Sequence, residues 1–109
     1  MSKINLTHKD KDYTLEFSRQ SVKTMEQQGF VLDELTSKPM TMLPMLFQGA
    51  FIMHHKGAVK RKEMDEIYKG IKDRSALMEA LMEMYAETLS TLMDDDAEEA
   101  GNVSWALVR

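Results

Sequence analysis

Cysteine is absent from this chain of 109 residues, which excludes disulfide bonds and any site that uses a thiolate as nucleophile or metal ligand. A secretory signal is also lacking, because the first six residues contain no apolar core segment. The longest stretch free of charge, 39–53, has fifteen residues, whereas about 20 apolar residues are needed to cross a bilayer. We therefore expect a cytoplasmic protein with no membrane partner, and we interpret 39–53 as a buried helix.

Basic residues do not outnumber acidic residues in this chain either. The net charge is −4, and residues 94–109 account for all of it, with five acidic side chains and one basic side chain. Residues 1–93 are neutral, with thirteen acidic and thirteen basic side chains. Nucleic-acid binding depends on clustered positive charge, so we expect no nucleic-acid partner.

The sequence also lacks the residue patterns of common catalytic and metal sites. His54 and His55 are adjacent, so on a helix they diverge by about 100° and do not readily hold one metal ion. There is neither a glycine-rich phosphate loop nor a nucleophile elbow. Carboxylate pairs such as Asp65 and Glu66 lie in charged stretches, without the apolar surroundings of a catalytic acid. We expect no enzymatic activity, no metal and no cofactor.

The first seventeen residues show the alternation of apolar and polar side chains that is typical of strands. Ile4 and Leu6 lie on one side of a polar segment, 8–12, and residues 13–17 alternate again on its other side. This pattern predicts a β-hairpin with one apolar face and a loop at 8–12. Because an isolated hairpin is marginally stable in water, that face is expected to pack against helices or a partner.

The next segment carries the signals of a helix and its end. Ser18 is a suitable N-cap, since its hydroxyl can accept from a free amide of the first turn. Gly29 can take the left-handed conformation that closes a helix. A short helical turn around Asp33 is expected to follow.

The uncharged stretch predicts a second helix, capped by Ser37 or Thr41 and running to about Lys56, with Gly57 after its end. Pro44 would then lie in the first turn, where a missing amide has little effect. Apolar residues cover nearly every side of this helix, which is typical of a central helix.

Two more helices complete the predicted fold. One lies within residues 59–70, where the cations 60–62 oppose the helix dipole and predict a frayed or looped start. Asp73 is expected to cap the last helix, 74–93. We predict an α+β, mostly helical fold in which an N-terminal β-hairpin packs on a bundle of about four helices. Residues 1–93 would form one globular domain, and 94–109 a flexible acidic tail.

The last helix carries more apolar surface than one contact requires. Six residues cover an arc of about 100°, as an ordinary core-facing stripe does: Leu77, Leu81, Met84, Tyr85, Thr88 and Leu92. Four others, Met78, Met82, Leu89 and Met93, widen it to about 180°. The chain holds 11 methionines, and methionine adapts to partners of different shape. These four residues are candidate partner contacts, although gap filling in the core and a self-association seam are alternatives.

The C-terminal tail contains the only tryptophan, Trp105, among the apolar residues Val103, Leu107 and Val108. These residues would be unusual in a purely solvated tail. A docked strand or a short motif for a partner is one interpretation, and a frayed end is the other. Trp105 is therefore also a candidate partner contact.

Short motifs along nearly the whole chain resemble the tail assembly chaperones of long-tailed bacteriophages. They are Tyr-Thr-Leu-Glu-Phe at 13–17 with the run 18–30, Leu-Pro at 43–44, Gly-Ala-Phe at 49–51, His-His-Lys at 54–56, the run 77–88 and Gly-Asn-Val-Ser-Trp at 101–105. Each motif is short, and none of them is a chemical signature.

This resemblance implies a function in the cytoplasm of the infected bacterium. Proteins of this kind bind the tape measure protein, keep it soluble and recruit tail tube subunits, and they are absent from the finished virion. The candidate contacts named above would then meet a client or a neighbouring copy. Alternatives are a structural virion component, such as a head–tail connector subunit, and a small regulatory enzyme or nuclease inhibitor.

Overall fold

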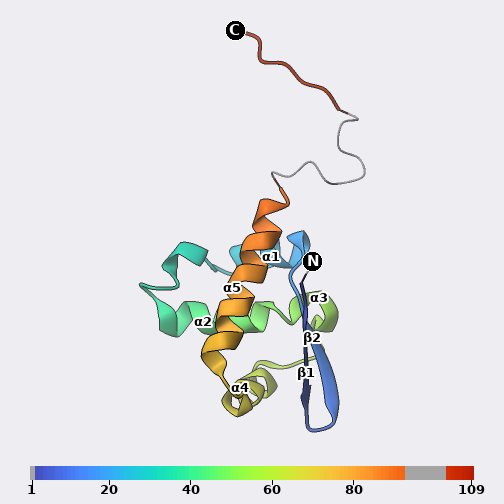
Figure 1. Ribbon diagram of the computed structural model, residues 1–109, viewed down its shortest axis with the longest axis vertical. Helices are drawn as coiled ribbons and strands as arrows, with labels where there is room; N and C mark the ends of the chain where they lie inside the picture. The colour runs from blue at the N-terminus through green and yellow to red at the C-terminus, as the bar shows by residue number, and fades with distance from the viewer. Residues whose placement is uncertain (1, 93–102) are drawn as a thin grey trace.

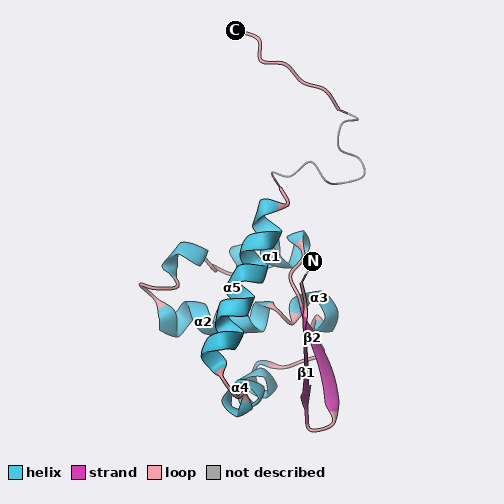
Figure 2. Ribbon diagram, viewed as in Figure 1, coloured by secondary structure: helices cyan, strands magenta, loops and turns pink. Residues whose placement is uncertain are grey.

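The computed structural model describes residues 2–92 and 103–109. A two-stranded antiparallel hairpin lies beside a group of helices, and α5 crosses the middle of that group (Figures 1 and 2). The predicted α+β, mostly helical fold is thereby confirmed. The elements are β1 (Ile4–His8), β2 (Lys11–Leu15), α1 (Arg19–Gln27), the 3₁₀ helix η1 (Leu32–Glu34), α2 (Pro39–Gly49), α3 (Ile52–His55), α4 (Arg61–Gly70) and α5 (Arg74–Ser90).

The hairpin turn is tighter than the sequence pattern predicted. The strands pair from Ile4 with Leu15 to His8 with Lys11, which leaves only Lys9 and Asp10 in the turn. Both residues have positive φ angles, 49° and 65°, as expected for a two-residue turn that follows the twist of the strands. The predicted loop at 8–12 was therefore too long, because its outer residues join the strands.

The outer edge of β2 is covered by helical residues and not by a third strand. The Thr14 amide donates to Nε2 of His55 at 3.0 Å, and the Glu16 amide donates to the Ala50 carbonyl at 3.0 Å. These bonds satisfy backbone donors that an open edge would leave unpaired. They also fix the hairpin against α3, so its apolar face reaches the core.

The start and end of α1 agree with the sequence signals. The Ser18 hydroxyl accepts from the Ser21 amide at 3.0 Å, and the Ser21 hydroxyl accepts from the Ser18 amide at 2.8 Å. This reciprocal pair is a capping box built from two serines. Gly29 has a φ of +101° and ends the helix, and η1 supplies the predicted turn around Asp33.

The predicted helix from Ser37 or Thr41 to Lys56 was wrong in its start and its continuity. Lys38 is the N-cap and Pro39 is the first residue of α2, because proline lacks an amide and already has a helical φ. Pro44 therefore lies inside the helix. Its missing amide deprives the Met40 carbonyl of a donor, but Met40 is 89% exposed, so water can satisfy that group.

A break at Ala50 and Phe51 separates α2 from α3. Both side chains are buried, and the Ala50 carbonyl is the acceptor that holds the strand end at Glu16. The break thus joins the hairpin to the helices. Gly57, with a φ of +73°, follows α3 as predicted.

The last two helices begin at cap residues near the expected positions. The predicted fraying at 60–62 is not found, because α4 begins at Arg61 after the N-cap Lys60, and Glu63 places an acid in its first turn. The Asp73 carboxylate accepts from the Ala76 amide at 3.4 Å and caps α5. The prediction that this helix runs to residue 93 was wrong, because α5 ends at Ser90 with Thr91 as its C-cap. Residue 93 itself and the tail residues 94–102 lie outside the described residues.

Candidate protein-binding surface

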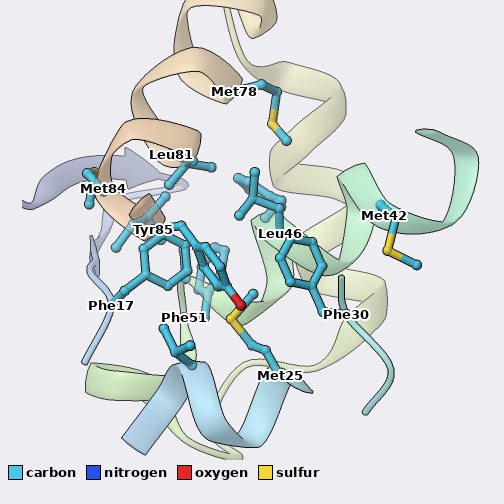
Figure 3. Close-up of a cluster of buried hydrophobic side chains, with 14 of the residues drawn as sticks. Phe17, Met25, Phe30, Met42, Leu46, Phe51, Met78, Leu81, Met84 and Tyr85 are labelled. Atoms are coloured by element: carbon cyan, nitrogen blue, oxygen red, sulfur yellow. The ribbon is translucent and has the colours of Figure 1, made fainter. Parts of the chain in front are cut away.

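The packing of α5 decides which of its apolar residues remain available to a partner. Its buried side chains are Met78, Leu81, Met84, Tyr85 and Thr88. In Figure 3, the labelled side chains of α5 project toward aromatic and aliphatic side chains of other elements. The Tyr85 ring packs edge-to-face on Phe17 and Phe30, with centroid separations of 5.5 and 5.0 Å. The helix therefore buries four of the six residues of the predicted arc and, in addition, Met78 at one edge of it.

Met78 was predicted as a partner contact, and the structure places it in the core instead. It is 5% exposed, so a partner cannot reach it in the folded protein. The reason is that α5 packs against both α1 and α2, and two neighbouring helices occupy a wider arc than one. Of the three interpretations of the methionine-rich arc, core filling is the correct one for Met78.

The other candidates from α5 and the tail differ in their surroundings. Met82 and Leu89 are half-buried and pack against the core with part of their side chains. Leu92, predicted to face inward, is 67% exposed. Met93 lies outside the described residues. Trp105 is 86% exposed, and 103–109 form neither helix nor strand, so a docked strand is not found there.

Leu89 lies where two surface depressions meet, between α1 and the C-terminal half of α5. One, of about 390 Å³, is lined by Arg19, Val22, Lys23, Glu26, Thr88, Leu89 and Leu92. The other, of about 380 Å³, is lined by Glu26, Phe30, Val31, Leu32, Asp33, Tyr85 and Leu89. Because they share Glu26 and Leu89, we treat them as one surface and call it the α1–α5 groove.

The groove has an apolar floor and a charged rim of two signs. Arg19 and Lys23 line the depression beside Leu92, whereas Asp33 lines the depression beside Phe30. Glu26 lies between them and lines both. An extended or helical peptide with apolar side chains could therefore lie along the groove in a preferred direction.

Arg19 also fixes one wall of the groove. Its Nε donates to the Thr91 hydroxyl at 3.0 Å, and its guanidinium also donates to the Thr91 carbonyl. These bonds place a cation at the C-terminal end of α5, where the helix dipole favours positive charge. The contact joins residues 72 positions apart and holds α1 beside α5.

Tyr85 contributes a polar group to the groove. Burial, and then the nearby Glu26 carboxylate, raise the pKa of its hydroxyl to about 12. The hydroxyl is therefore protonated at neutral pH and can donate a hydrogen bond. Within 2–92 and 103–109 we find no acceptor bonded to it, although the residue lines the depression beside Phe30.

The apolar pattern of the sequence indicated Leu89 but not the α1 side of the groove. Arg19, Lys23 and Glu26 recur at spacings of four and three, which places them on one helix face. That spacing was the available signal. It did not show that this face borders α5, because the contact depends on tertiary packing.

A larger depression of about 610 Å³ lies elsewhere, lined by Gln28, Met45, Gln48, Gly49, Ile52, Arg61 and Met64. It contains none of the candidates predicted from the sequence. Within the described parts of the chain, no three His, Asp or Glu side chains are grouped so as to hold a metal ion. Among the described helices, none combines the length and apolar character needed to span a membrane.

Comparison with protein families gives a match over nearly the whole chain. A family model with the description "Domain of unknown function (DUF5055)" matches residues 1–108. The chain therefore belongs to this family. Neither the curated proteins nor the solved structures contain a match to it.

Proposed function

We propose that this member of the DUF5055 family is a tail assembly chaperone of a long-tailed bacteriophage. In this proposal it binds the tape measure protein in the cytoplasm of the infected bacterium and recruits tail tube subunits. The observation that carries the proposal is the resemblance of the motifs along the chain, which begins with Tyr-Thr-Leu-Glu-Phe at 13–17 and ends with Gly-Asn-Val-Ser-Trp at 101–105.

The surface of the protein supports a role in binding other proteins. Leu92 and Trp105 are 67% and 86% exposed, and Leu89 lies in the α1–α5 groove. Trp105 is a separate exposed apolar side chain in the tail. Leu89 and Leu92 both line the α1–α5 groove, and neighbouring large apolar side chains on a surface typically mark a protein interface. A client that is a long helix would offer a row of apolar side chains to such a surface.

We place the client contact on the edge of α5 formed by Met82 and Leu89. These residues are seven positions apart, so they lie on the same helix face about 10 Å from each other. Both are half-buried, so each keeps part of its side chain available. Methionine at this edge would allow contact with client segments of different shape.

The test is co-expression with the tape measure and tail tube proteins of the same phage, followed by pull-down and light scattering. The expected result is a soluble complex with either protein, and aggregation of the tape measure protein without the chaperone. Met82→Glu should weaken the complex at least tenfold, because a carboxylate would be buried in an apolar contact. The matched control is Met40→Glu, since Met40 is an exposed methionine on α2.

Met82→Glu must be compared at equal folded concentration, because part of its side chain packs against the core. We therefore expect some loss of stability. If neither phage protein bound the wild-type chain, the chaperone proposal would be wrong. If the chain copurified with finished virions, a structural component such as a head–tail connector subunit would replace it.

A further inference from the structure

We infer that the α1–α5 groove binds the C-terminal segment 103–108 of a second copy of this chain. The segment reads Val-Ser-Trp-Ala-Leu-Val. Its four large apolar side chains are all strongly exposed: Val103 at 85%, Trp105 at 86%, Leu107 at 68% and Val108 at 89%. The groove and the segment are thus two unpartnered apolar surfaces on one molecule.

The segment is long enough to extend past α1 along the groove. Six extended residues span about 20 Å, and the nine-residue helix α1 is about 14 Å long. The segment can therefore run from the Arg19 end of the groove, along Val22 and Leu89, to the depression beside Phe30. Its alternating pattern would turn Val103, Trp105 and Leu107 toward the same side.

The charges of the two surfaces are complementary in one direction. Arg19 and Lys23 line one end of the groove, and Asp33 lines the other. In the sequence, five acidic residues precede the segment and Arg109 follows it. If Val103 lies near Lys23, the acidic residues that precede the segment approach Arg19 and Lys23. Arg109, which follows the segment, then approaches Asp33. The reverse direction would place like charges together.

The segment of a second copy fits the observations better than the chain's own segment. The apolar side chains of 103–108 are exposed, and none of these residues lines the groove of its own chain. Each copy would then offer one groove and one segment. Such a head-to-tail contact is not self-limiting, so it builds rings or longer arrays. This inference does not depend on the identity of the client.

The contact is small, so assembly should be weak and depend on concentration. Light scattering of the wild-type chain, up to about 1 mM, should show a mass that rises above that of a monomer. Trp105 is the only tryptophan. Its emission should move to shorter wavelength over the same concentration range, as the ring leaves water.

Two variants that each remove one half of the contact provide the decisive test. Trp105→Ala removes the anchor of the segment, and Leu92→Glu places a charge in the groove at a side chain that is 67% exposed, so folding should be retained. Each variant alone should remain monomeric. A mixture of the two should form dimers and nothing larger, because it contains only one kind of intact groove and one kind of intact segment.

The matched control, Met40→Glu, should assemble like the wild type. Circular dichroism tests whether Leu92→Glu is folded. Lys23→Glu is a second groove variant, which should weaken assembly and reduce the dependence of assembly on salt concentration. Three results would overturn the inference. The first is a wild-type chain that stays monomeric at every concentration while its Trp105 emission remains that of a ring in water. The second is a wild-type chain that stays monomeric while its Trp105 is buried at every concentration. The third is a Trp105→Ala variant that assembles like the wild type. The second would show that each chain binds its own segment.

Discussion

Gly49 lies at the contact between α2 and α1, and the structure predicts that even a methyl group is too large there. A Cβ at this position would lie 2.5 Å from Cε and 2.7 Å from Cγ of Met25, and it would also overlap Sδ. Met25 is 1% exposed. Its side chain is flexible, but because it is buried among close-packed side chains, its movement away from the new methyl group should shift its neighbours.

The size of the effect follows from two opposing terms. Overpacking of a well-filled core typically costs about 1–3 kcal/mol. Replacing glycine by alanine in a helix recovers about 0.5–1 kcal/mol. Gly49→Ala should therefore lower the free energy of unfolding by about 1.3 kcal/mol at the midpoints of these ranges, and by at most about 2.5 kcal/mol. Each kcal/mol corresponds to a fall in Tm of about 4–8 °C in a domain of this size.

Urea unfolding followed by circular dichroism measures this change. Gly70→Ala is the matched control, because Gly70 is also the last residue of a helix and its added Cβ would meet no atom within 4 Å. That substitution should be neutral or stabilising. In a Met25→Ala background, which removes the overlapping atoms, Gly49→Ala should become stabilising. An equal loss of stability in both backgrounds would refute the steric explanation.

Two further substitutions test the assignment of α5 residues. Met78→Ala should lower the free energy of unfolding by about 2–5 kcal/mol without weakening client binding by the folded protein. A loss of client binding without a loss of stability would show instead that Met78 is a partner contact and not a core residue. Tyr85 has its pKa raised to about 12, so its contribution to stability is complete below about pH 10 and is lost as the pH rises to about 12. Between those pH values, the free energy of unfolding measured in urea should therefore fall less for Tyr85→Phe than for the wild type. An equal fall would contradict the assignment of the raised pKa to Tyr85.

Local signals in the sequence were sufficient for much of the fold. The caps at Ser18 and Asp73 and the left-handed Gly29 depend on groups within three or four residues, and all of them were predicted correctly. The start of α2 failed for a local reason too. Pro39 at the first helical position is a stronger signal than a serine or threonine side chain nearby, and the sequence analysis gave it too little weight.

The candidate site was less predictable, because burial on α5 depends on how many elements surround it. The helical wheel correctly placed Leu81, Met84, Tyr85 and Thr88 inside. It could not show that a second packed helix buries Met78, or that α5 ends at Ser90 and leaves Leu92 beyond it in solvent. Those outcomes depend on contacts with α1 and α2, which are far away in the sequence.

Arg19 of α1 contacts Thr91, the C-cap of α5, at one end of the α1–α5 groove. This contact supplies a cation to the end of α5, and it joins the two walls of the groove. An occupant of the groove therefore touches the same helix end that leads to the tail. A client bound in the groove would occupy the surface that we propose for the segment 103–108 of a second copy, so we expect client binding and self-association to compete.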